Sequence, residues 1–532
     1  MSSDEPAAAE PEQRDTTLLS QRRVPDFLTR DTDDDAAALE GYELASWLFL
    51  RGLGLIYAIA FFSLAVQILG LVGSDGILPL AEYLTAAHAG WGSDAYRKLP
   101  TLFWLTQSDI ALVSGAWLGV ALGLLVALGR WQRACLIALF VLYLSYVYAG
   151  QLFMSYQWDL LLLESGFLAI FLTGGSRIVV WLYRWLLFRF MFLAGLVKIM
   201  SGDATWQNLN ALSYHFWTQP LPSPLAWYAA QLPGWLLSGV VVAVLALELM
   251  LVFLIFAPRR PRLLVACLII AFQIAIMATG SYNWFNLLTI LLCVFLLDDK
   301  TLRRLMPAGL ARRISDRSLE PGLTETIVAA AVALVTVPVG VNMIWEPLTG
   351  RNMPIAAAVG ETLSPLLIVN SYGVFATTTT TRPQIVIEGS RDGKEWRPYV
   401  LPYLPGPVAR APTWSIPLQP RLDWQLWFAG YSSAAQARWI ERVAQRLLEG
   451  SGPVTGLFAE DPFAGEGPKY VRAQVYDYRF AAAGSDDWWA RKLDGMLMPR
   501  VSLENFQAKP LVVPKPQPAV PGPGRVNQTA PE

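Results

Sequence analysis

The sequence predicts an α-helical multi-pass membrane bundle of about nine spans, followed by a soluble β-rich C-terminal domain. Hydrophobic residues make up 54% of the 532-residue chain and charged residues only 16%, against about 25% charged in a typical soluble protein. Long apolar runs fill 44–345, which we assign to the membrane domain. Strand-like alternation and turn signals follow in 346–509, which we assign to the soluble domain.

The apolar runs divide into nine candidate spans. They fall at about 44–72, 110–128, 134–153, 159–172, 178–200, 235–257, 263–279, 284–297 and 323–345. An upright span needs roughly 17–25 residues, so the fourth and eighth runs are short for the role. Residues 1–43, which are acidic and poor in large apolar groups, predict a disordered cytosolic N-terminus, and 510–532 predict a Pro-rich disordered tail.

The distribution of basic residues predicts which side of the membrane each loop occupies. The loops at 149–157, 201–234 and 279–283 contain no Lys or Arg, whereas the loops between them are basic, as cytosolic loops are. We therefore expect a cytosolic N-terminus and a C-terminal domain on the periplasmic, extracellular or lumenal side. The membrane would be the plasma (inner) membrane in a bacterium and the endoplasmic reticulum membrane in a eukaryote.

Three segments predict the elements of the C-terminal domain. Ile385–Tyr399 indicates a β-hairpin, because Asp392-Gly393 supplies the residues of a tight turn. Val471–Phe480 alternates polar and apolar residues as a strand does. Ala434–Leu448 has the apolar stripe of an amphipathic helix.

Charged residues inside apolar helices are the first functional candidates, because a charge in hydrocarbon is costly and is usually retained for a reason. Arg189 lies in the middle of a span, and we expect an intramembrane ion pair with Glu164 and Asp159, or a ligand site. Lys198 lies near the outer end of the same span. It is either an interfacial lysine whose amine reaches water or a partly desolvated base or ligand anchor.

The other candidates lie in the outer loops and the C-terminal domain. His215 is either a structural histidine or a catalytic one. Asn283 and Asn286 either cap a helix or line the same cavity as the outer-loop candidates. Arg421, Asp423 and the neighbouring aromatic residues form either a protein-binding patch or a packed strand with a local salt bridge.

Several classes of site and partner are disfavoured. The chain has only two histidines, and its three cysteines lie in apolar runs without metal spacing, so we expect no metal site and no thiol-redox role. The net charge of −1 argues against a nucleic-acid partner.

Several stretches together resemble the lipase maturation factor family. They are SYQWDLLLLESGFLAIFL (155–172), FRFMFLAGLVKI (188–199), SYHFWTQPLPSPLAWY (213–228), GSYNWFNLLTILLCVFLLDD (280–299), VNSYGVF (369–375), RLDWQLWFAGY (421–431) and DPFAGEGPKYVRAQVYDYRF (461–480). The resemblance implies a non-enzymatic membrane chaperone that binds lipase-like secreted client proteins and needs no cofactor. The candidate client- or ligand-binding residues are Asp203, Trp206, Tyr214, Gln219, Asn283, Asn286, Arg421, Asp423 and Trp424.

The membrane half is also distantly similar to vitamin K-dependent γ-glutamyl carboxylase. Ala194-Gly195-Leu-Val-Lys198 and Asp203-Ala-Thr-Trp206 match a segment in which the corresponding lysine of that enzyme is a base. This resemblance implies an alternative function, a membrane enzyme that uses Lys198, with His215, on a quinone-like cofactor or a lipid ligand. We prefer the maturation-factor interpretation.

Overall fold

The computed structural model describes residues 41–172, 176–315, 322–433 and 437–508. The segments predicted to be disordered, 1–43 and 510–532, lie outside the described residues except for 41–43.

Among the described residues, six helices are long and apolar enough to cross a membrane. They are α3 (Glu43–Ala65), α7 (Asp109–Ala127), α8 (Gln132–Ala149), α10 (Arg177–Met200), α15 (Arg259–Thr279) and α19 (Leu323–Thr349). At about 1.5 Å per residue, 18–27 residues reach roughly 27–40 Å, which matches a hydrocarbon core about 30 Å thick. The chain is therefore a multi-pass membrane protein.

The predicted count of nine spans is not confirmed. The fourth predicted span is α9 (Gln157–Ala169), whose 13 residues are mostly buried against other helices and reach only about 20 Å. The sixth and eighth become the short helices α14 (Gly234–Leu249) and α16 (Phe285–Leu292), continued by the 3-10 helices η3 (Leu251–Phe256) and η4 (Cys293–Leu296). Hydropathy cannot distinguish a helix buried in protein from one buried in lipid, so it does not decide how many of the nine apolar runs cross the membrane.

Short helices fill the segments that the sequence indicated as long loops. The segment 73–109 contains α5 (Leu80–Trp91), α6 (Asp94–Lys98) and η1 (Leu102–Trp104). The segment 201–234 contains α11 (Ala204–Gln207), α12 (Ala211–Thr218) and α13 (Pro224–Ala229). The other short elements described before the sheet are α4 (Ile68–Val72), η2 (Gln151–Met154), α17 (Asp299–Leu305), α18 (Ala308–Ser315), α20 (Pro354–Leu363) and η5 (Ser364–Leu366).

The C-terminal domain, as far as it is described, is built on a four-stranded antiparallel sheet with strand order β2-β1-β3-β4. The strands are β1 (Pro383–Ser390), β2 (Arg397–Pro398), β3 (Tyr470–Phe480) and β4 (Trp489–Val501). The predicted hairpin is confirmed, with Glu388 opposite Pro398, and so is the predicted strand at 471–480. Strand β4 was not predicted, since its Lys492, Gly495 and Pro499 are poor strand formers.

The helices described in this domain are α21 (Arg421–Gly430), α22 (Trp439–Leu448), α23 (Gly452–Thr455) and α24 (Leu503–Ala508). The segment that begins at Arg421 is a helix, so its interpretation as a packed strand was wrong. The amphipathic helix predicted at Ala434–Leu448 is present as α22, which buries Trp439, Val443 and Leu447 as expected; residues 434–436 lie outside the described residues.

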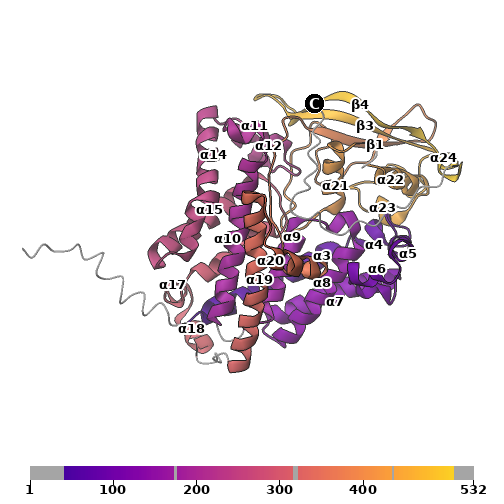
Figure 1. The fold of residues 1–532 in the computed structure, drawn as a ribbon. Coiled ribbons are helices and arrows are strands. Elements are labelled where there is room, and N and C mark those ends of the chain that lie inside the picture. The colour runs from indigo at the N-terminus through magenta and orange to yellow at the C-terminus, as the bar shows by residue number, and fades with distance from the viewer. Residues whose placement is uncertain (1–40, 173–175, 316–321, 434–436, 509–532) are drawn as a thin grey trace, which may run out of the picture. The chain divides into compact units, whose positions relative to one another are not determined.

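Helix α3 links the two ends of the membrane domain. At its start, the Asp299 carboxylate of α17 accepts hydrogen bonds from the backbone N–H groups of Glu43 (3.1 Å) and Leu44 (3.4 Å). Near its other end, Ser63 hydrogen bonds to Gln419 of the C-terminal domain. The 23 residues of α3 separate these ends by about 34 Å. The C-terminal domain therefore packs on one end of the bundle, with α17 and α18 at the other (Figure 1).

Candidate functional site

Arg189 forms a buried ion pair between α10 and α9. Its guanidinium contacts the Glu164 carboxylate, and both side chains are almost fully buried. The guanidinium also donates a hydrogen bond to the Asn370 carbonyl oxygen (3.0 Å). The other Glu164 oxygen accepts hydrogen bonds from the Asn370 N–H (3.0 Å) and the Tyr372 hydroxyl (2.8 Å). The ion pair thus holds a segment of chain as well as two helices.

Lys198, nine residues further along α10, contacts the same segment of chain. Its amine lies 2.8 Å from a Glu248 carboxylate oxygen of α14 and 3.3 Å from the Val374 carbonyl oxygen, and it also donates to the Ala194 carbonyl oxygen at 3.0 Å. Neither this ion pair nor an amine so deeply buried was predicted from the sequence; only 2% of the Lys198 side chain is exposed.

The segment that these charges hold, residues 370–378, will be called the strap. It connects α20 and η5 to β1 without regular secondary structure, so its backbone polar groups need partners elsewhere. Trp206 donates its indole N–H to the Phe375 carbonyl oxygen (3.1 Å), and the Asp203 carboxylate accepts from the Thr378 N–H (3.2 Å). Asp203 also caps α11 through the Thr205 and Trp206 N–H groups.

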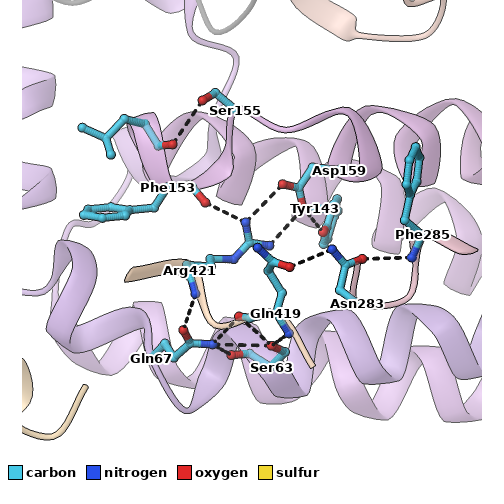
Figure 2. A network of polar contacts seen from close by, with 11 residues as sticks. Ser63, Gln67, Tyr143, Phe153, Ser155, Asp159, Asn283, Phe285, Gln419 and Arg421 are labelled. Atoms are coloured by element: carbon cyan, nitrogen blue, oxygen red, sulfur yellow. Dashed lines mark hydrogen bonds and ion pairs between the residues drawn. The ribbon is translucent and has the colours of Figure 1, made fainter. Parts of the chain in front are cut away.

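A third buried ion pair connects α21 of the C-terminal domain to α9 (Figure 2). The Arg421 guanidinium lies 3.0 and 3.1 Å from the two Asp159 oxygens and donates to the Phe153 carbonyl oxygen at 2.7 Å. The Tyr143 hydroxyl donates to the same carboxylate at 2.5 Å. The expectation that Asp159 pairs with Arg189 was wrong, because Asp159 is bidentate to Arg421, a geometry that leaves the carboxylate satisfied.

The loop before α21 is hydrogen bonded to two membrane helices (Figure 2). The Gln419 N–H donates to the Ser63 hydroxyl (2.9 Å), and its side-chain carbonyl accepts from the Asn283 amide (2.7 Å). The Asn283 side-chain oxygen accepts from the Phe285 N–H at the start of α16 (2.9 Å), which is the capping role predicted for it. Asn286 donates to Gln273 of α15 at 2.7 Å, so it joins two helices instead.

Arg382, which immediately precedes β1, anchors the sheet to the end of α12 and the residues that follow it. Its guanidinium donates to the carbonyl oxygens of Trp217 (3.1 Å), Gln219 and Pro220 (2.8 Å). Burial lowers the pKa of Arg382 to about 10, so it is charged at neutral pH. The Gln219 side chain accepts from the Tyr282 hydroxyl at 2.8 Å. Arg382 was not predicted as a site residue, since a lone arginine after a threonine run carries no recognisable signal.

His215 lies on α12, half-buried, with its ring 5.1 Å from that of Phe375 in the strap. Burial, together with the nearby Lys198 charge, lowers the pKa of His215 to about 4. The imidazole is therefore neutral at pH 7. The Tyr214 ring, also half-buried, lies 6.3 Å from Trp217.

Asp423 is buried inside the C-terminal domain, whereas Trp424 packs into the junction with the membrane domain. The Asp423 carboxylate accepts from the N–H groups of Tyr403 (2.9 Å) and Leu404 (2.8 Å), and burial raises its pKa to about 6. Trp424 is 3% exposed and packs on Trp158, with ring centroids 4.7 Å apart. Arg421 pairs with Asp159 rather than with Asp423, so the predicted local salt bridge was wrong. A client cannot reach these buried side chains in this structure.

The arrangement is therefore a polar junction that docks the C-terminal domain onto the membrane helices. Arg189, Lys198 and Arg421 are each neutralised by a buried carboxylate, and pairing of this kind offsets the cost of burying a charge. Within the described residues, no group of three His, Cys, Asp or Glu side chains could hold a metal ion.

The family model for the lipase maturation factor transmembrane domain matches residues 44–304, and that for the lipase maturation factor C-terminal domain matches 368–499. The chain belongs to the lipase maturation factor family. A relative in Gallus gallus, lipase maturation factor 2, is 34% identical over 86% of this chain and 81% of its own length. Lipase maturation factor 1 of Mus musculus is 32% identical over 90% of this chain and 91% of its own length. Lipase maturation factor 2 of Homo sapiens is 32% identical over 87% of this chain and 84% of its own length.

No solved structure matches this member of the family. The two matched ranges include both the membrane helices up to α17 and the sheet. The carboxylase alternative is not supported by these comparisons, and the structure places Lys198 in a buried ion pair with Glu248.

Proposed function

We propose that this protein assists the maturation of exported lipase-like proteins, with its C-terminal domain on the non-cytosolic side of the membrane. The observation that carries the proposal is the match of both domains to lipase maturation factors. The protein would act without a cofactor and without catalysing a reaction, as a folding assistant. The protein would lie in the membrane across which the client is exported.

The surface that meets the client must lie outside the junction, because Arg421, Asp423, Trp424 and Asn283 are buried. The outer face of the sheet offers exposed apolar side chains. Leu493 and Met496 of β4 are each more than half exposed and lie opposite Tyr476 and Gln474 of β3. Exposed apolar groups on a folded domain are typical contacts for an incompletely folded partner.

The test is co-expression of an exported lipase with this protein in cells that lack it. We expect the secreted lipase activity per amount of lipase antigen to rise several-fold with the parent protein. The variant Leu493→Ser/Met496→Ser should lose most of that gain while remaining folded. An unchanged specific activity with the parent protein would contradict the function, whereas full activity of the variant would contradict only the surface.

A second pair of variants distinguishes docking from catalysis at Lys198. Lys198→Met alone leaves Glu248 buried without a partner, whereas Lys198→Met/Glu248→Leu removes both charges. We expect the double variant to retain more lipase maturation than the single variant. A catalytic lysine would leave both variants equally inactive, and that result would reopen an enzymatic role.

A further inference from the structure

Helices α17 and α18 lie at the end of the bundle remote from the C-terminal domain (Figure 1) and contain several basic residues. Leu302 of α17 and Ala311 and Ile314 of α18 are buried. The opposite sides expose three arginines, Arg304, Arg312 and Arg313. None of the three forms an ion pair or hydrogen bond with any residue that the structure describes. Three positive charges therefore face the surroundings without compensation by the described part of the chain.

Apolar side chains lie beside these arginines on the same two helices. Leu305 is 72% exposed and Leu310 is 37% exposed. Exposed leucines next to arginines fit a helix lying in the interface plane, because its apolar side chains enter the acyl region while its basic groups stay among the headgroups.

Contacts with the membrane helices fix the level of α17 along the bundle. The Asp299 carboxylate of α17 caps the start of α3. Asp298, directly before α17, pairs with Arg259 at the start of α15 (2.5 Å) and caps α17 through the Thr301 N–H. Two spans thus begin at α17, and α18 packs against α3 beside it. The exposed arginines lie at the level where spans leave the hydrocarbon core.

We propose that α17 and α18 form a binding surface for anionic phospholipid headgroups in the leaflet at this end of the bundle. The charge of the surface fits phosphate and carboxylate headgroups. The exposed leucines fit the acyl chains of a lipid and have no counterpart in a free phosphate ion. A basic residue near an anionic membrane surface contributes about 1 kcal/mol, or about fivefold in affinity, so three residues together contribute about 100-fold.

The experiment uses the full-length protein in neutral detergent, titrated with phosphatidylglycerol or phosphatidylcholine. Native mass spectrometry counts the bound lipids, and the midpoint of thermal unfolding measures stabilisation. We expect the parent protein to prefer phosphatidylglycerol and to be stabilised by it, more weakly at high salt because salt screens exposed charges. Arg304→Gln/Arg312→Gln/Arg313→Gln should bind phosphatidylglycerol about 100-fold more weakly.

Two further variants keep the result interpretable. Arg304→Lys/Arg312→Lys/Arg313→Lys retains the charge and should retain the preference. Arg397→Gln/Arg438→Gln/Lys492→Gln removes the same charge from exposed positions of the C-terminal domain and should bind as the parent does. The proposal is overturned if the first triple variant binds phosphatidylglycerol like the parent, if the matched control loses binding equally, or if glycerol phosphate stabilises the parent as well as the lipid does.

Discussion

At the scale of single residues, the ionic groups in the membrane domain work as docking contacts. The sequence predicted a partner for Arg189 because Glu164 lies on the preceding helix, 25 positions away. It could not predict the pairing of Arg421 with Asp159, which are 262 positions apart and belong to different domains. Charge alone does not decide between nearby and distant partners. That choice is made by how the helices pack.

The pair between Asp159 and Arg421 gives a prediction about stability. Asp159→Ala leaves a fully buried guanidinium without its carboxylate, so we expect the free energy of unfolding to fall by about 3–5 kcal/mol. The matched control is Glu466→Ala, which breaks an exposed pair with Arg391 and should cost no more than about 1 kcal/mol. Unfolding in mixed micelles by a denaturing detergent measures both. Equal losses in the two variants would contradict the docking role of the buried pair.

His215 gives a prediction about pH. Its pKa is lowered from 6.5 to about 4, so between these values the unfolded chain binds a proton that the folded protein does not. Stability therefore decreases as the pH falls from 6.5 to 4, by no more than about 3 kcal/mol for this half-buried group. His215→Gln should remove that component from the stability profile.

The comparison must be made between the variant and its parent. Asp423 contributes with the opposite sign, because its pKa is raised from 3.8 to about 6 and the folded protein binds its proton first as the pH falls. His88→Gln, at an exposed position, controls for the loss of a histidine. A parent and a His215→Gln variant with the same slope between pH 4 and 6.5 would contradict the assignment.

At the scale of elements, the close contact between α3 and α7 depends on glycines. Added Cβ atoms at Gly54 of α3 and Gly123 of α7 would lie 2.5–2.7 Å from backbone atoms of the facing helix, and one at Gly119 would meet the Phe61 ring at 2.3 Å. Helices in membranes approach closely where small residues face each other. The sequence predicted both helices as spans, but not that they cross at these glycines.

The crossing predicts the effect of one added methyl group. Gly123→Ala should destabilise the protein by about 1–3 kcal/mol through overpacking, although alanine is the better helix former by about 1 kcal/mol. Gly239→Ala on α14, where a Cβ meets no described atom within 4 Å, should be neutral or stabilising. Micelle unfolding again measures both variants. If Gly123→Ala and Gly239→Ala changed the free energy of unfolding by the same amount, the assignment of the crossing between α3 and α7 would be wrong.

At the scale of the whole molecule, the contacts at the two ends of α3 predict that α18 and the sheet face opposite sides of the membrane. Helix α18, which contains Gly309, and the strands β3 and β4, whose connection contains Ser485, lie at opposite ends of the bundle (Figure 1), and both residues are exposed. In a Cys267→Ser background, Gly309→Cys should react with a membrane-impermeant maleimide only from the cytosolic side, and Ser485→Cys only from the opposite side. Labelling of both from one side would overturn the orientation expected from the basic loops.

The sequence by itself determined the membrane class, the family, the long apolar helices, helix α22 and the strands β1 to β3, because hydropathy, turn residues and residue identity are local properties. It also indicated the polar residues that matter, including Arg189, Gln219 and Arg421. Only the tertiary structure decided what those residues touch. A buried charge needs an opposite charge or several hydrogen-bond partners in three dimensions, since an uncompensated charge is too costly to bury. Glu164, the partner of Arg189, is only 25 positions away and could be predicted, whereas Asp159 and Arg421 are 262 positions apart and lie in different domains, where no pattern along the chain could assign them.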